Sequence, residues 1–130
     1  MIVDTSAIIA IGNREPDSDQ LLDALGTADH IKMSAATWVE LGIVVDARED
    51  PLVARRADNL LNELGVEIEP VTMEQAMIAR QAYRDFGKGR HAAGLNFGDC
   101  FSYALAKATG EPLLFKGTDF SHTDIEARLP

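Results

Sequence analysis

The sequence has one cysteine, one tryptophan and three histidines, and no apolar run long enough to cross a membrane. Cys100 alone can form neither an internal disulfide nor a cysteine-based metal site. A membrane helix needs about 20 predominantly apolar residues, and the N-terminus has no basic segment followed by an apolar run. We therefore expect a cytoplasmic protein with no membrane segment, in which oxygen or imidazole ligands hold any metal ion.

Basic residues are also scarce, with 12 Lys and Arg against 21 Asp and Glu and a formal net charge of −9. This balance argues against a nucleic-acid partner, because phosphate binding depends on Lys and Arg. Between residues 80 and 91, however, four basic residues accompany a single acid, Asp85. We expect this basic strip, with its glycine-rich loop, to contact RNA phosphates through Arg84, Lys88, Arg90 and His91.

The length of 130 residues and the hydrophobic content of 46% suit one hydrophobic core. The sequence contains no long polar, proline-rich or repetitive tract that would indicate disorder. We predict a single domain spanning residues 1–130.

Short apolar runs alternate with segments of helical periodicity along the chain. The predicted strands are residues 2–3, 30–33, 66–70 and 113–115, and the predicted helices are residues 5–11, 16–26, 35–48, 51–64, 73–86 and 97–109. Residues 125–129 are predicted to add a short edge strand. This alternation predicts an α/β fold, a three-layer α/β/α sandwich with a mostly parallel central sheet.

The helix predicted at residues 35–48 has almost no polar face, so we expect protein to surround it nearly completely. Glu40 is its only carboxylate between Ala35 and Val45. Burial of an isolated charge is very unfavourable. Glu40 should therefore form an ion pair with Arg48, Arg55 or Arg56, face water at the helix edge, or serve a functional site.

Three further acids stand at element boundaries, and each also has a structural interpretation. Asp4 follows the first strand and could be a helix N-cap. Asp99 lies three residues after Asn96, where a carboxylate can complete a capping box. Asp119 follows the last strand and could belong to a turn.

These acids can converge with Glu40, because ligands of open α/β sheets collect beyond the carboxyl ends of the strands. Several like charges in one place repel each other unless a cation lies among them. Oxygen ligands without cysteine or paired histidine suit Mg²⁺ or Mn²⁺. Such an ion can promote phosphodiester hydrolysis.

Four segments contain these acids, in the order Ile2–Ser6, Trp38–Leu41, Leu95–Phe101 and Leu113–Phe120. In this order they resemble the segments of PIN-domain ribonucleases, in particular VapC toxins. The resemblance implies that Asp4, Glu40, Asp99 and Asp119 form a catalytic cluster that binds Mg²⁺ or Mn²⁺. It also implies that Ser6 orients a metal ligand or a water molecule. Asp124 is an alternative for the fourth acid.

The same resemblance implies a biological role and partners. It predicts a metal-dependent endoribonuclease that is the toxin of a toxin–antitoxin pair, cleaves structured RNA and arrests translation. A cognate VapB-like antitoxin would cover the site, and the toxin would form a homodimer.

Two other functions remain open. A haloacid-dehalogenase-like phosphatase also begins with a strand and an Asp nucleophile, but it needs a second acid two positions later, where this chain has Ser6. A catalytically inactive PIN-like module would only bind a partner. We interpret Trp38, Phe97 and Phe101 as packing residues, and Cys100 as a small core residue.

Overall fold

The computed structural model describes residues 1–129. In chain order, its elements are β1 (Ile2–Val3), α1 (Thr5–Gly12), α2 (Ser18–Gly26), β2 (Lys32–Ser34), α3 (Ala35–Asp46), α4 (Pro51–Glu63), β3 (Glu67–Glu69), α5 (Met73–Phe86), α6 (Asp99–Thr109), β4 (Leu113–Leu114) and the 3-10 turn η1 (Phe120–His122). Within the described residues, no helix combines the length and hydropathy that crossing a membrane requires.

The four strands form one sheet in the order β3-β2-β1-β4, and every pairing is parallel. The central strand β1 pairs with β2 on one side and with β4 on the other. The edge strand predicted at residues 125–129 is present as a single bridge between Leu113 and Ala127. The backbone N–H of Arg128 donates to the Leu113 carbonyl at 2.9 Å there.

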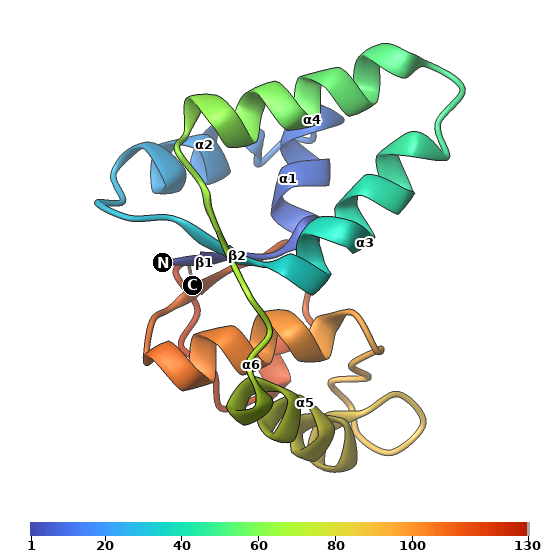
Figure 1. The fold of residues 1–130 in the computed structure, drawn as a ribbon, viewed down its shortest axis with the longest axis vertical. Helices are drawn as coiled ribbons and strands as arrows, with labels where there is room; N and C mark the ends of the chain where they lie inside the picture. The colour runs from blue at the N-terminus through green and yellow to red at the C-terminus, as the bar shows by residue number, and fades with distance from the viewer. Residues whose placement is uncertain (130) are drawn as a thin grey trace.

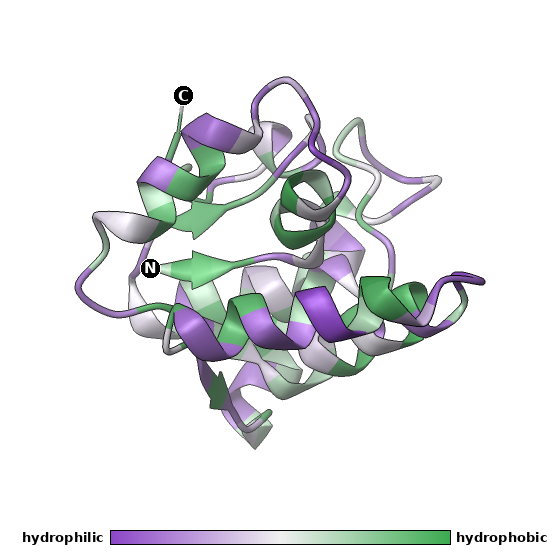
Figure 2. Ribbon diagram, turned by 90° about the horizontal axis from the view of Figure 1, so that it is seen from above, coloured by the Kyte–Doolittle hydropathy of each residue, from purple (hydrophilic) through white to green (hydrophobic). Residues whose placement is uncertain are grey.

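Helices cover both faces of this sheet, as Figure 1 shows, with α1 to α4 on one side and α5 and α6 on the other. Successive strand residues point to opposite faces. Val3 and Leu114 therefore belong to the first core, and Ile2 and Leu113 to the second. Figure 2 shows the matching hydropathy: the strand at the N-terminus is uniformly hydrophobic, while the covering helices are striped. The predicted three-layer α/β/α fold is confirmed.

Side-chain caps set two helix starts where the sequence predicts them. The Ser34 hydroxyl accepts a bond from the Ala36 N–H at 3.3 Å and begins α3. The Thr72 hydroxyl accepts from the Gln75 N–H at 3.2 Å and begins α5. Helix α6 differs, because it begins at Asp99 and not at the predicted Phe97.

The expectation that protein nearly surrounds α3 is wrong. Thr37, Leu41 and Val45 are buried, but Trp38 is 47% exposed and Ile43 66% exposed. The helix packs one face against the rest of the chain, and its opposite face is also apolar. In β3 the apolar residue Ile68 is likewise exposed. Hydrophobic periodicity therefore overestimated burial at this edge of the sheet.

Candidate active site

Asp4 lies directly after β1, where its carboxylate caps α1 and is almost fully buried. One oxygen, Oδ2, accepts bonds from the Ser6 backbone N–H at 3.1 Å and from the Ser6 hydroxyl at 2.7 Å. The other, Oδ1, accepts from the Ser102 hydroxyl at 2.5 Å. The N-cap interpretation is thus correct but incomplete, because α6 also holds this carboxylate.

Behind Asp4 lies a buried set of hydroxyls that reasoning from the sequence missed. Ser102 Oγ and Thr37 Oγ1 are 3.1 Å apart, and both residues are fully buried. Thr5 donates to the Thr37 carbonyl at 3.4 Å. Spacing could have revealed these residues, because Thr37 precedes Glu40 by three and Ser102 follows Asp99 by three. Residues three apart lie on one helix face.

Glu40 is half-buried, and burial raises the pKa of its carboxyl above the ordinary value. The nearby Thr5 hydroxyl opposes this rise, while the negative charge of Asp4 adds to it. The alternative interpretation, an ion pair of Glu40 with Arg48, Arg55 or Arg56, is not supported, because no such pair forms among the described residues. Glu40 is therefore held near another acid without a neutralising cation.

Gly98 provides the space in which Glu40 approaches the start of α6. A Cβ atom at residue 98 would overlap the Glu40 carboxylate. The backbone here is right-handed helical, with φ −64° and ψ −42°, a conformation that any residue can adopt. Glycine is thus needed for its lack of a side chain and not for its backbone freedom.

Asp99 is the acid that the charges of the other three acids all affect. Its backbone N–H donates to Asn96 Oδ1 at 2.8 Å, and its Oδ2 accepts from the Asn96 N–H at 2.9 Å, a reciprocal capping arrangement. Burial raises the pKa of the Asp99 carboxyl to about 6, the Asn96 N–H opposes that rise, and the charges of Asp4, Asp119 and Glu40 add to it. The structure thus brings the four predicted acids into one neighbourhood.

Of the two candidates for the fourth acid, Asp119 lies near Asp99 and Asp124 is held elsewhere. Asp124 accepts a bond from the Tyr103 hydroxyl at 2.6 Å and pairs with Lys107 at 2.6 Å. Asp119 is exposed at the start of η1 and raises the pKa of Asp99. Because Asp124 already has a cation, it is the poorer candidate for a metal ligand.

Ser6 joins two parts of this neighbourhood. Its hydroxyl donates to Asp4 and accepts a bond from the Lys116 backbone N–H at 3.0 Å. Lys116 begins the segment that leads from β4 to Asp119. The Ser6 hydroxyl therefore orients the Asp4 carboxylate and fixes the start of that segment.

The basic strip lies beside the N-terminal end of α6. Arg84, Lys88 and Arg90 line one cavity together with Asn96. His91 has a local role, because its Nδ1 accepts a bond from the Ala93 N–H at 3.0 Å and its ring packs edge-on against Phe86. Phe97, interpreted as a packing residue, packs only one side of its ring against Phe101 and is 78% exposed.

The donor chemistry of the site fits a hard divalent cation. The charges of Asp4, Glu40 and Asp119 all act on Asp99, and none of these four carboxylates forms an ion pair within residues 1–129. In that same part of the chain, no three ligand-type side chains form a closed metal-binding group. Mg²⁺ does not need one, because it commonly keeps several waters and binds one or two carboxylates together with substrate phosphate oxygens.

Comparison with known families identifies the family and the fold. The PIN domain model matches residues 1–126. This chain belongs to the PIN-domain family. It is 55% identical over 130 residues to ribonuclease VapC28 of Mycobacterium tuberculosis, covering 99% of this chain and 98% of the relative. The predicted membership in the VapC group of PIN-domain proteins is confirmed.

Solved structures from toxin–antitoxin systems share the fold over nearly the whole chain. VapC20 of Mycobacterium tuberculosis, described as a toxin that cleaves the sarcin-ricin loop, has a TM-score of 0.75 and 20% identity, covering 95% of each chain. A toxin–antitoxin complex from Klebsiella pneumoniae has a TM-score of 0.71 and 17% identity, covering 95% of this chain and 92% of that one. At these identities the likeness establishes the fold.

The raised pKa of Asp99 predicts a pH-dependent stability difference between the metal-free wild type and Asp99→Asn. The folded carboxyl keeps its proton until about pH 6, whereas its ordinary pKa is 3.8. The folded state therefore binds more protons across this window, and wild-type stability falls relative to the variant as pH rises. Partial exposure screens the effect, so we expect the variant to be more stable by about 1–2 kcal/mol above pH 6.

Denaturant unfolding in EDTA between pH 4 and pH 7 measures this difference. The side-chain amide at position 99 still has an oxygen that can accept the bond from the Asn96 backbone N–H. The helix cap should therefore persist in the variant. A stability difference that stays constant over the whole range would contradict the prediction.

Proposed function

We propose that this chain is an Mg²⁺- or Mn²⁺-dependent endoribonuclease and the toxin of a toxin–antitoxin pair. The observation that carries this proposal is the convergence of Asp4, Glu40, Asp99 and Asp119 without neutralising cations. The ribonuclease names of its relatives support it. The family match over residues 1–126 supports a single nuclease domain over residues 1–130. Action on cellular RNA would place the protein in the cytoplasm.

In this proposal the four acids have different roles in metal binding and proton transfer. A bound Mg²⁺ or Mn²⁺ ion would neutralise phosphate oxygens and lower the pKa of a coordinated water. Asp4 and Asp99 would hold the ion, with Asp4 oriented by the hydroxyls of Ser6 and Ser102. Glu40 and Asp119 would complete the ligand set or accept a proton from the attacking water.

The alternatives are unequal. A haloacid-dehalogenase-like phosphatase is disfavoured because the PIN domain model matches nearly the whole chain and because Ser6 occupies the position of the second acid. An inactive PIN-like module would have little reason to keep four acids together at the cost of their repulsion. The following experiment separates it from an enzyme.

Asp99→Asn should lower RNA cleavage by at least about 100-fold, because it removes a charged metal ligand from the site. Asp119→Asn should lower cleavage by at least about tenfold for the same reason. Gly98→Ala should also lower it by at least about tenfold, since its methyl group would displace the Glu40 carboxylate. The measurement is cleavage of a panel of structured RNAs by purified protein with Mg²⁺ or Mn²⁺, and EDTA should abolish it.

Two variants are matched controls. Asp124→Asn removes a carboxylate that pairs with Lys107, and Gly26→Ala adds a methyl group where nothing lies within 4 Å. Both should cleave RNA at close to the wild-type rate. Equal activity of Asp99→Asn and wild type would refute the assignment of Asp99 to the active site. Loss of activity in Asp124→Asn but not in Asp119→Asn would make Asp124, and not Asp119, the fourth acid.

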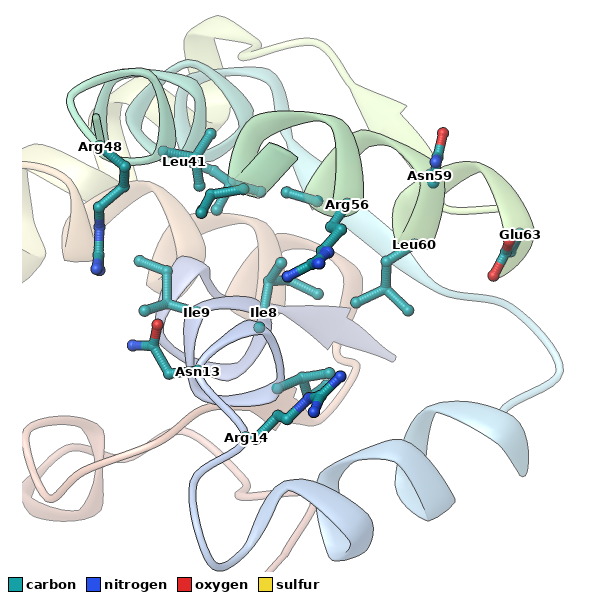
Figure 3. Close-up of a pocket in the computed structure, with 15 residues that line it drawn as sticks. Ile8, Ile9, Asn13, Arg14, Leu41, Arg48, Arg56, Asn59, Leu60 and Glu63 are labelled. Atoms are coloured by element: carbon teal, nitrogen blue, oxygen red, sulfur yellow. The ribbon is translucent and has the colours of Figure 1, made fainter. Parts of the chain in front are cut away.

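This chain has a candidate docking groove for the cognate VapB-like antitoxin between α1, α3 and α4. A cavity of about 380 Å³ lies between α1, α3 and α4, with Ile8 and Leu60 on its walls (Figure 3). Arg14, Arg48 and Arg56 surround it, and none forms an ion pair within the described residues. We propose that an antitoxin segment with apolar and acidic side chains binds here. The Klebsiella protein of the same fold forms a toxin–antitoxin complex.

Arg56→Glu should weaken antitoxin binding at least about tenfold, because it places a negative charge where an acidic segment would bind. Arg55→Glu is the matched control, since Arg55 is exposed on α4 but does not line the cavity. Isothermal titration with the cognate antitoxin measures both variants. Identical affinities of the two variants would place the antitoxin elsewhere.

The homodimer proposed from the family resemblance has a candidate interface on α3. Trp38, Val39 and Ile43 form an exposed apolar face there, and such a face commonly marks an interaction site. Ile43→Ser should shift the protein toward the monomer, because it removes apolar area from the contact. Sedimentation velocity measures this, with Leu52→Ser on α4 as the control. A dimer of unchanged stability in Ile43→Ser would exclude this interface.

A further inference from the structure

A second cavity, of about 730 Å³, opens between α5, the loop at residues 87–94 and the start of α6. The acid cluster does not account for it. Its walls include four cations and three aromatic rings, namely Arg80, Arg84, Lys88 and Arg90, and Tyr83, Phe97 and Phe101. This combination suits a nucleotide, because cations bind its phosphate and aromatic rings stack on its base.

The aromatic part of the wall is exposed and held in place. Phe97 is the most exposed large hydrophobic residue in the described chain, at 78%. Its ring packs against Phe101 at a centroid distance of 4.9 Å and an interplanar angle of 81°. This edge-to-face contact fixes one side of the pair and leaves much of the Phe97 ring free. An exposed phenyl ring does not contribute the stability that its burial would bring. The exposed position of Phe97 is therefore better explained by binding to another molecule than by folding.

The cationic part of the wall is equally free. Within residues 1–129, none of the four cations forms an ion pair. The protein carries a net charge of −9, so acids to pair with them are plentiful elsewhere. A polyanion that approaches the acid cluster must cross this repulsive field, and the four cations offer it one favourable approach.

The cavity lies beside the acid cluster. Asn96 lines it, and the Asn96 backbone N–H donates to Asp99 Oδ2 at 2.9 Å. Phe97 follows Asn96 directly and precedes Gly98, which contacts Glu40. A nucleotide in this cavity would therefore be a near neighbour of a phosphodiester bound at the acids.

We propose that this cavity binds an unpaired nucleobase of the RNA substrate, next to the phosphodiester that is cleaved. The base stacks on Phe97, and the arginines and Lys88 contact its flanking phosphates. The inference rests on the proposed ribonuclease function and names the substrate class as RNA with a single-stranded segment at the cleavage site. A base inside a duplex has no free face to offer an aromatic ring, whereas an unstacked one does.

Binding can be tested apart from cleavage in an Asp99→Asn background with EDTA present. The probe is a fluorescent single-stranded RNA oligonucleotide, and the readout is its affinity across a salt series. Phe97→Ala should weaken binding about 5- to 160-fold, the range for loss of one stacked base, with the salt slope unchanged because no charge is lost. Phe97→Trp should restore affinity. Arg84→Gln should reduce the salt slope.

Three controls make the result specific to a base. Leu22→Ala removes an exposed apolar side chain from α2 and should leave affinity unchanged. A ribose-phosphate oligomer without bases, and a fully paired RNA duplex, should each bind the Phe97→Ala variant and its parent with equal affinity. Sedimentation must give the same oligomeric state for both proteins.

The outcomes separate this inference from the proposed function. Equal affinity of the Phe97→Ala variant and its parent for single-stranded RNA would overturn the inference, even if wild-type protein cleaves RNA. Dissociation of a dimer by Phe97→Ala would also overturn it and make the cavity an interface between copies. A Phe97-dependent affinity in a protein that cleaves no RNA would support the cavity while refuting the nuclease.

Discussion

The structure around the candidate site depends on one constraint, the placing of several carboxylates together without cations. Asp4 is buried at the end of β1, and hydroxyl and N–H groups of Ser6 and Ser102 satisfy both of its oxygens. Hydrogen bonds stabilise the charged form without cancelling its charge. The negative charge of Asp4 therefore remains near Asp99. Burial raises the pKa of Asp99 to about 6, and the charges of Asp4, Asp119 and Glu40 add to that rise.

This arrangement costs stability, and the fold supports it with rigid elements. Asp4, Glu40 and Asp99 come from three different elements that pack around the central strand. The buried contact between Thr37 and Ser102 holds α3 and α6 together just below the acids. Gly98 then allows the Glu40 carboxylate to reach the start of α6. A residue with any side chain there would relieve the crowding by separating the acids, so the close approach is built into the sequence.

Charge is divided over the surface in a way that the net value conceals. Asp4, Glu40, Asp99 and Asp119 lie at one end of the sheet without ion pairs among the described residues, while several cations without ion pairs line two cavities, one beside Asp99 and one between α1 and α4. Some acids outside the site are paired, as Asp124 is with Lys107 and Glu111 with Lys32. Asp124 and Asp119, only five residues apart, thus have different surroundings.

The sequence alone determined the order of strands and helices, because apolar period and cap residues are local properties. It also singled out Asp4, Glu40, Asp99 and Asp119, since acids at strand ends or in an apolar helix conflict with simple burial. Tertiary structure decided which residues contact one another and which are exposed. The hydroxyls of Thr37 and Ser102 come from α3 and α6 to lie beside Asp4. Phe97 and Ile43 face solvent, although their sequence patterns indicate packed residues. Periodicity defines the faces of a helix, but which of those faces another element covers depends on packing between segments far apart in the chain.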